Sequence, residues 1–384
     1  MTPDEIRGNV RALLPSIAKR GDEIERLRRL PADLVEDLRG AGAFRIAAPQ
    51  ARGGPELRPR EQVELIEELA VVEPSVAWCV MIGSDGPYAS AFLAPAVVEE
   101  LFPSIDMVLA GLAQPAGRAV VTDGGYTVSG RWAFGSGCTH ADVLLGGCLV
   151  FDDASSPPRM RPDGQPEWRI AVAPREQWEI LDTWYTTGLA GSGSNDYTVQ
   201  DLFVPEAHTF TFYDAPRRPE ALYAFAGTFV TNMSGVPLGI ARRAIDVVVE
   251  TAPGKLVMPE MQMMKDLRRV RSAVAHAEAV LGAARAYVYE SLDRAWETLS
   301  SGEPLTVDER NALSLSRAHS FRVALDVTRS MVDAMGASAV YASSPLDRLH
   351  RDAITINQHI VTQERTYETL GGTLLGEPLL FPLY

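Results

Sequence analysis

The stretch that decides the fold reads GGYTVSGRWAFGSGCTHA and runs from Gly124 to Ala141. Aromatic and branched residues that favour strands recur in it at short spacing, and glycines interrupt them as they do at turns. Alternate side chains of a strand point to the same face, so Trp132, Phe134 and Ser136 are expected to share one face. The stretch therefore predicts strands of a β domain.

The β pattern continues on both sides of this stretch, over residues 108–213. Short runs of Val, Ile, Leu and aromatic residues are separated by turn-forming residues, and the last run alternates well before it ends at Pro205. The predicted strands include Val143–Leu145, Cys148–Phe151, Trp168–Val172 and Tyr197–Val204. We expect a central β domain, folded as a small barrel or a sandwich.

Helical patterns flank the β zone. Apolar residues recur at helical spacing over residues 4–19 and 59–72, and residues 76–82 are almost entirely apolar, as in a buried helix. Long periodic segments over residues 238–251, 259–299 and 306–336 predict a four-helix bundle. The expected fold is α+β, with an N-terminal helical domain (1–107), the β domain (108–213) and a C-terminal bundle (214–384).

Composition narrows the class of protein. A chain of 384 residues predicts two or three packed units, and a net charge of -14 argues against nucleic acid as a partner. No apolar run approaches the roughly 20 residues that span a bilayer, and residues 1–20 lack the apolar core of a secretory signal. Cys79, Cys138 and Cys148 have no metal-ligand spacing, so we expect no metal site and a cytoplasmic protein.

Four stretches carry a resemblance to a known family. The first is Gly111–Ala119 together with the motif Gly124–Ala141, and the others are Gly188–Asp196, Met335–Tyr341 and Ser344–His359. Over nearly the whole chain, the sequence resembles the group D flavin-dependent monooxygenases, which share the acyl-CoA dehydrogenase fold. The resemblance implies an acyl-CoA dehydrogenase-like architecture for the three zones.

The resemblance also implies an activity. Such a protein is the oxygenase component of a two-component system, and it hydroxylates an aromatic or indole-like small molecule through a C4a-hydroperoxyflavin. The implied cofactor is reduced FAD, with reduced FMN as the alternative, and O2 is the co-substrate. A separate NAD(P)H-dependent flavin reductase would supply the flavin, which fits the lack of a nicotinamide-binding pattern in this sequence. The implied assembly is a homotetramer.

Three alternatives stay open at this point. The same chemistry can oxygenate the nitrogen of an amine. The dehydrogenases of this fold carry a catalytic glutamate about where His359 stands here, so acyl-CoA dehydrogenation would need a displaced base such as Glu368. A non-catalytic scaffold is the third alternative, and the intact Ser136 and His359 motifs argue against it.

The resemblance assigns catalytic roles to His359 and Ser136. His359 is expected on a helix that starts near Leu349, on one face with Asp352 and with either Thr355 or Ile356, and a histidine can move a proton near neutral pH. A satisfied, partly buried histidine is the alternative interpretation. Expected flavin contacts are Trp132, Phe134, Ser136, Gln114, Ser192, Ser194, Gly336 and Ser338, the last two possibly from a neighbouring subunit. The alternative interpretation of Trp132 and Phe134 is that they are ordinary residues of a β core.

The substrate is expected between the buried helix of the first zone and the bundle. Trp78, Met81, Asp85 and Tyr88 are the predicted lining, and Trp78 and Met81 have the alternative of plain core residues. Asp85 is a charge within an apolar stretch, and it either orients a polar group of the substrate or caps the next helix. A buried ion pair that anchors the bundle is the alternative to a functional role for Arg348, Arg351 and Asp352.

Overall fold

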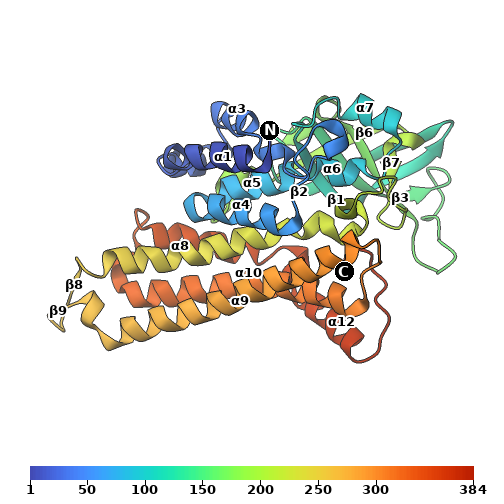
Figure 1. The fold of residues 1–384 in the computed structure, drawn as a ribbon. Helices are drawn as coiled ribbons and strands as arrows, with labels where there is room; N and C mark the ends of the chain where they lie inside the picture. Colours follow the sequence, from blue (N-terminus) through green and yellow to red (C-terminus); the bar gives the residue numbers. More distant parts are fainter.

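The computed structural model describes residues 1–384 and has the three expected zones in chain order (Figure 1). The N-terminal zone starts with a capping box at Thr2 and Glu5. Its fifth helix starts at Pro74, and nine of its ten residues are buried, so the apolar run of residues 76–82 is a buried helix as predicted. The helices are α1 (Pro3–Ile17), α2 (Gly21–Leu27), α3 (Ala32–Ala41), α4 (Pro59–Val72), α5 (Pro74–Gly83), α6 (Gly86–Ser90) and α7 (Pro95–Leu101).

The β domain is a seven-stranded mixed sheet with the order β5-β6-β2-β1-β3-β4-β7. Only β1 and β3 pair in parallel among the strand pairs of this sheet. The sheet ends at β5 and β7, so it does not close into a barrel, and the sandwich alternative fits it. The strands are β1 (Leu109–Thr122), β2 (Gly125–Gly135), β3 (Val143–Phe151), β4 (Trp168–Pro174), β5 (Glu179–Leu181), β6 (Asn195–Pro205) and β7 (Thr209–Phe210).

The expectation that Trp132, Phe134 and Ser136 share one face is wrong. The register of β2 against β6 shifts between Trp132 and Gly135, and Phe134 has a φ of 62°, so the strand bulges and alternation is lost. Trp132 is fully buried, stacks on Tyr197 with ring centroids 5.6 Å apart, and donates from Nε1 to the Gly147 carbonyl. Phe134 is 66% exposed. Trp132 is therefore a β-core residue, and its full burial is incompatible with a flavin wall.

The C-terminal zone is a bundle in which α8, α9 and α10 run side by side (Figure 1). α8 approaches α4 closely, since a Cβ built on Gly239 would lie 2.5 Å from the Cβ of Ala70. The long second helix starts at Arg268, later than the expected residue 259, because a short hairpin of β8 (Leu256–Val257) and β9 (Gln262–Met263) precedes it. The helices are α8 (Gly235–Thr251), α9 (Arg268–Ser300), α10 (Val307–Met335), α11 (Pro345–Ile356) and α12 (Glu364–Leu374).

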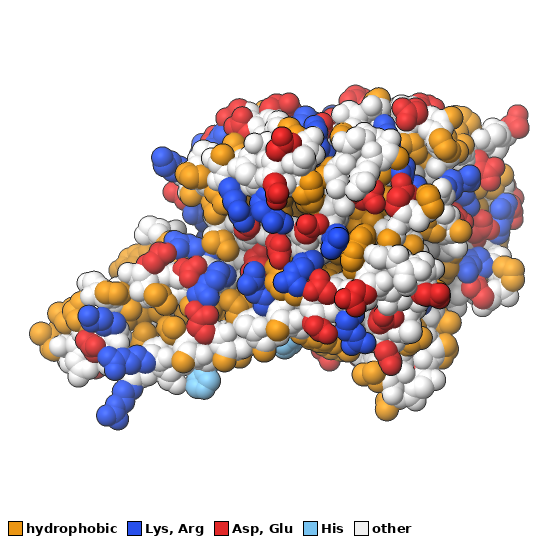
Figure 2. Space-filling view, viewed as in Figure 1, with side chains coloured by type: hydrophobic (Ala, Val, Ile, Leu, Met, Phe, Trp, Pro, Cys, Tyr) orange, Lys and Arg blue, Asp and Glu red, His pale blue; other side chains and the backbone are white.

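A single core of 76 buried residues passes through all three zones, from Ile6 in α1 to Val361 near the end of the bundle. The zones are therefore packed onto one another rather than separated by linkers. Charged side chains of both signs are intermixed along the seam between the N-terminal helices and the bundle (Figure 2). None of the helices combines the length and the apolar character that crossing a bilayer requires.

Candidate active site

Trp78 of α5 joins the two predicted catalytic residues. Its Nε1 donates to the hydroxyl of Ser136 at 2.9 Å, and its ring packs edge-on against His359 with centroids 5.7 Å apart. Trp78 is 4% exposed and comes from a helix that is apolar on all sides. The structure thus brings Trp78, Ser136 and His359 together from three distant parts of the chain.

Three buried serines continue from this contact. The hydroxyls of Ser136 and Ser194 lie 2.7 Å apart, those of Ser194 and Ser192 also 2.7 Å apart, and Ser192 donates to the carbonyl of Leu189 at 2.7 Å. Each hydroxyl has one hydrogen, so the last bond fixes the direction of the others. Ser194 donates to Ser192, and Ser136 donates to Ser194. Ser136 accepts from Trp78 and keeps one lone pair for a further donor.

His359 lies outside the helix on which it was expected. α11 starts at Pro345 and ends at Ile356, and His359 instead starts a short 3-10 turn, Ile360–Thr362. Its Nδ1 accepts from the backbone N–H of Val361 at 3.4 Å, which places the proton of the neutral ring on Nε2. Burial, and secondarily the charge of Arg317, lower the pKa of His359 to about 4. The imidazole is therefore neutral at neutral pH, with an N–H to offer.

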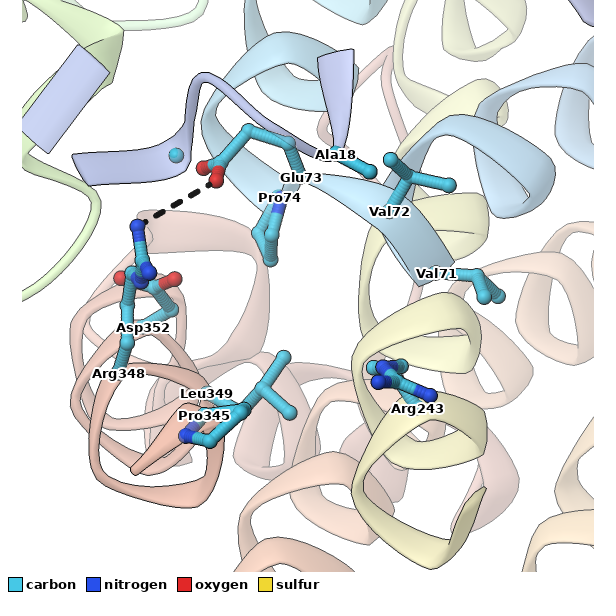
Figure 3. Close-up of a pocket in the computed structure, with 11 residues that line it drawn as sticks. Ala18, Val71, Val72, Glu73, Pro74, Arg243, Pro345, Arg348, Leu349 and Asp352 are labelled. Carbon is cyan, nitrogen blue, oxygen red and sulfur yellow. Dashed lines mark ion pairs between the residues drawn. The ribbon is translucent and has the colours of Figure 1, made fainter. Parts of the chain in front are cut away.

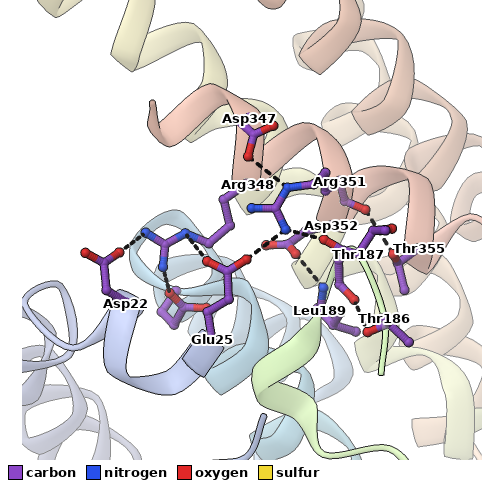
Figure 4. A network of polar contacts seen from close by, with 12 residues as sticks. Asp22, Glu25, Thr186, Thr187, Leu189, Asp347, Arg348, Arg351, Asp352 and Thr355 are labelled. Carbon is purple, nitrogen blue, oxygen red and sulfur yellow. Dashed lines mark hydrogen bonds and ion pairs between the residues drawn. The ribbon is translucent and has the colours of Figure 1, made fainter. Parts of the chain in front are cut away.

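Asp352 of α11 holds the serine loop, residues 189–194, which carries Ser192 and Ser194. Its Oδ1 accepts from the backbone N–H of Leu189 at 2.5 Å, and Leu189 has a φ of 52°, a strained conformation for a leucine (Figure 4). Burial, together with the nearby Glu73, raises the pKa of Asp352 to about 7. Asp352 therefore anchors this loop through a hydrogen bond to the backbone, and it forms none of the ion pairs that the alternative predicted for it.

Two arginines of α11 complete the anchor (Figure 4). Arg351 donates to the carbonyl of Thr187 and pairs with Glu25 at 2.7 Å and with Asp347 at 2.8 Å. Arg348 pairs with Asp22 at 2.9 Å. These contacts tie the bundle to α2 and to the serine loop, so ion pairs anchor the bundle as the alternative predicted, but the pairs are partly exposed rather than buried.

A cavity of about 310 Å³ lies beside this anchor, between the α4–α5 junction, α8 and α11 (Figure 3). Glu73 and Asp352 bring carboxylates to it, and Arg243 and Arg348 bring guanidinium groups. None of the residues predicted to bind flavin or substrate lines it. We therefore do not place the active site there.

The predicted substrate residues are buried and have protein partners. Met81 is fully buried, and the Tyr88 hydroxyl hydrogen-bonds with Gln62. Asp85 makes no helix-capping hydrogen bond, so the capping alternative is wrong. The Nδ2 of Asn232 lies 3.5 Å from the Asp85 carboxyl, whose pKa burial raises well above its ordinary value.

Sequence reasoning missed Asn232 and Trp184. The side-chain carbonyl of Asn232 is buried and has no partner, next to Asp85. Trp184 packs edge-on against the exposed ring of Phe134 with centroids 6.2 Å apart, and its Nε1 donates to the Leu189 carbonyl. No local pattern marks either residue, because each acquires its neighbours only through tertiary packing.

The remaining predicted flavin contacts are Gln114, Gly336 and Ser338. Gln114 is exposed on β1. Gly336 and Ser338 follow the C-terminal end of α10, where Lys255 donates to the Met335 carbonyl at 2.6 Å and to Ser338. Within one chain, the structure does not join this cluster to Ser136.

Comparison with known proteins gives the family. Residues 2–92 match the acyl-CoA dehydrogenase N-terminal domain and residues 232–364 match the acyl-CoA dehydrogenase C-terminal domain. An indole-3-acetate monooxygenase from Pseudomonas putida is 34% identical over 371 residues, which cover 95% of this chain and 93% of that protein. The resorcinol hydroxylase oxygenase component of Rhizobium sp., described as FADH2-dependent, is 28% identical over 379 residues, covering 93% and 90%.

The crystal structure of a 3-HSA hydroxylase from Rhodococcus sp. RHA1 matches with a TM-score of 0.90 and 27% identity, covering 99% of both chains. The chain belongs to the flavin-dependent monooxygenases built on the acyl-CoA dehydrogenase fold. It is a monooxygenase that uses reduced flavin and O2, an oxygenase component that implies a separate flavin reductase. The expected fold and enzyme class are confirmed. Glu368 is exposed on α12, so it does not support the dehydrogenase alternative.

Proposed function

We propose that reduced FAD binds at the end of β2, where the exposed ring of Phe134 and the hydroxyl of Ser136 mark its place. The observation that carries this proposal is the direction of the serine chain, which leaves Ser136 as a hydrogen-bond acceptor. Reduced flavin has an N–H at its N5 position, so a donor meets an acceptor. When bound, the flavin supplies the electrons that activate O2 for insertion of one oxygen atom into the substrate.

The surrounding residues have separate roles in this proposal. Ser192 and Ser194 use their hydrogens within the chain, so they position Ser136 rather than donate to flavin. Trp78 fixes Ser136 from the other side and separates it from His359. Neutral His359 donates from Nε2 to the substrate oxygen or holds a proton at that atom during hydroxylation.

The proposed substrate is a planar aromatic or indole-like molecule. The names of the relatives support this proposal, since they specify indole-3-acetate and resorcinol as substrates of those proteins. The aromatic ring of Trp78 is the predicted substrate contact that lies next to both Ser136 and His359. Asp85 and Asn232 could orient a polar group, whereas Met81 and Tyr88 are packed in the core.

The proposal is tested by coupling of oxygen use to product formation. The protein is mixed anaerobically with photoreduced FAD and indole-3-acetate and then exposed to O2, and hydroxylated product and hydrogen peroxide are both measured. We expect product to account for most of the O2 consumed, and Ser136→Ala to shift the yield toward peroxide. Peroxide released at the rate of free reduced flavin, with no oxygenated product from any aromatic tested, would contradict the proposal.

We further propose a cytoplasmic homotetramer supplied by an NAD(P)H-dependent reductase. In such an assembly, Gly336 and Ser338 of one subunit can approach the adenosine end of a flavin held by another, and Gln114 is exposed for a contact on β1. The three cysteines are free and buried, as expected in a reducing compartment. Light scattering after size exclusion checks the assembly, and a monomer that binds reduced FAD at full affinity would contradict a shared flavin site.

A further inference from the structure

Arg317 is a buried cation without a counter-ion. It lies on α10 between the buried residues Leu313 and Phe321, and it is 2% exposed. Its Nε and Nη2 have no hydrogen-bond partner, and no carboxylate lies within ion-pair distance. Arg348 and Arg351 are both more exposed, yet each has carboxylate partners. An unpaired buried charge is costly, so it needs a reason other than stability.

The guanidinium lies beside the proposed active site. Asn357, two residues before His359, donates from its side chain to the carbonyl of Phe321 at 2.8 Å, and Phe321 is one turn along α10 from Arg317. The turn that starts at His359 packs against α10. The charge of Arg317 contributes to the lowered pKa of His359. Arg317 and His359 therefore lie on two elements that pack against each other, and Arg317 is buried there whereas His359 is half-buried.

The two unpartnered nitrogens form one edge of the guanidinium. Nε–H and one Nη2–H are parallel, and together they match the two oxygens of a carboxylate. The same edge holds carboxylates elsewhere in this chain. Arg11 donates from Nε and Nη2 to the two oxygens of Glu68 at 2.7 and 2.6 Å, and Arg45 binds Asp106 in the same way at 2.6 and 2.5 Å.

Nothing else in the chain supplies this edge with an anion. The one group of the chain that opposes the effect of burial on the pKa of Arg317 is Tyr384, a phenol and not a carboxylate, and its hydroxyl lies 3.1 Å from that of Thr366. The two N–H groups of this edge thus lack an acceptor, which an anionic ligand would supply.

We propose that the Nε–Nη2 edge of Arg317 binds a carboxylate of the substrate, so that the enzyme selects aromatic acids over neutral aromatics. This inference rests on the proposed function and names the substrate class for that site. Arg317 acts here as a specificity residue. It neutralises the buried carboxylate and places the ring relative to Trp78 and His359.

The test compares aromatic acids with their amides, which have nearly the same shape as the acids but lack the negative charge of the carboxylate. The probes are indole-3-acetate and indole-3-acetamide, with phenylacetate and benzoate and their amides as further pairs. Binding to wild type, Arg317→Met and Arg322→Met is measured by calorimetry, without flavin. Arg322 lies five residues along the same helix and is exposed, so it controls for loss of a charge.

We expect wild type and Arg322→Met to prefer at least one acid over its amide by roughly 10- to 100-fold, as for a charge-assisted pair. Arg317→Met should lose this preference through weaker acid binding, with amide binding changed less than about threefold. Without ligand, its melting temperature should equal or exceed that of wild type, because an unpaired buried charge is removed. A large drop in melting temperature would reveal an internal counter-ion and overturn the proposal.

Two further outcomes would also overturn it. The first is the absence of acid preference in every pair. The second is that Arg317→Met weakens the binding of reduced FAD, measured in a separate titration, while the preference for acids persists. That result would assign the guanidinium to flavin binding. Turnover of each pair distinguishes this inference from the proposed function. If acid and amide are hydroxylated equally, the proposed carboxylate site is contradicted and the proposed function stands. If an acid binds through Arg317 but is not hydroxylated with reduced FAD, the proposed function is contradicted and the carboxylate site stands.

Discussion

At the scale of single residues, the indole N–H of Trp78 sets the position of the Ser136 hydroxyl. Trp78→Phe keeps an aromatic ring next to His359 and removes the donor. We expect the fraction of O2 converted to product to fall by about tenfold, which corresponds to about 1.4 kcal/mol for one hydrogen bond. Product and peroxide yields measure it.

Trp178 provides a matched control for this change. It is 4% exposed, and its Nε1 is buried without a partner, so Trp178→Phe removes an indole N–H that makes no hydrogen bond. Coupling in this variant should equal that of wild type. Equal loss in both variants would mean that ring size, and not the bond to Ser136, determines coupling.

The protonation state of His359 gives a second prediction at this scale. Its pKa of about 4 lies below the ordinary value of 6.5, because burial and Arg317 disfavour the charged ring. We expect kcat/KM to show no limb from His359 between pH 5.5 and 8, since the residue stays neutral throughout that range. A limb near pH 6.5 that is lost in His359→Asn and kept in His319→Asn, an exposed residue of α10, would contradict the neutral donor.

At the scale of elements, α11 holds the serine loop through the carboxyl group of Asp352, which stays protonated up to an unusually high pH. Folded Asp352 has a pKa of about 7, against 3.8 in the unfolded chain. Between these pH values the folded state binds more protons, so the residue lowers the stability increasingly as the pH rises from 3.8 to 7. Asp352→Asn removes this effect and keeps an acceptor for the N–H of Leu189.

We therefore expect the melting temperature of Asp352→Asn to rise relative to wild type as the pH increases from 4 to 7. At pH 4 both side chains are uncharged in the folded state, and the difference in proton binding has only begun to accumulate. The two proteins should therefore agree closely at that pH, which is the internal control. Asp352→Ala leaves the Leu189 N–H buried without a partner and should cost about 1–3 kcal/mol. A difference between wild type and Asp352→Asn that does not depend on pH would contradict the raised pKa.

The elements show how far sequence reasoning can reach. The zones and the buried helix α5 follow from periodicity and apolar runs, which are local signals. The alternation of side chains along β2 wrongly predicted that Trp132, Phe134 and Ser136 share a face, because one positive φ at Phe134 and a bulge in β2 reverse the alternation. The motifs with Ser136 and His359 indicated important residues, yet their contact through Trp78 depends on three segments that meet only in the folded chain.

Arg317 illustrates a signal that the sequence does contain. An arginine on the buried stripe of a long helix, four residues from Leu313 and from Phe321, contradicts the apolar pattern around it. The pattern could have singled out this position. It could not have shown that the guanidinium lacks a partner, since partners come from other elements.

At the scale of the whole molecule, the continuous core predicts that the three zones unfold together. Gly239 lies where α8 contacts α4, and a Cβ there would be 2.5 Å from the Cβ of Ala70. Gly239→Ala should lower stability by about 1–3 kcal/mol through overpacking, in one cooperative transition observed equally by fluorescence and circular dichroism.

Gly282 on α9 is the control for this substitution, because it is exposed and has nothing within 4 Å of a built Cβ. Gly282→Ala should raise stability by about 0.5–1 kcal/mol through helix propensity alone. Separate transitions for the bundle and the β domain in Gly239→Ala would contradict a single cooperative core.

The one-way chain of hydroxyls ending at Ser136 bears on how the flavin circulates. In the proposed site, oxidised flavin has no hydrogen at N5, so an acceptor would face an acceptor, and the bond proposed for the reduced form would become a repulsion. Each turnover would then convert a tightly held molecule into a loosely held one. The oxidised flavin would dissociate without any conformational change in the protein, and it would return to the reductase by diffusion.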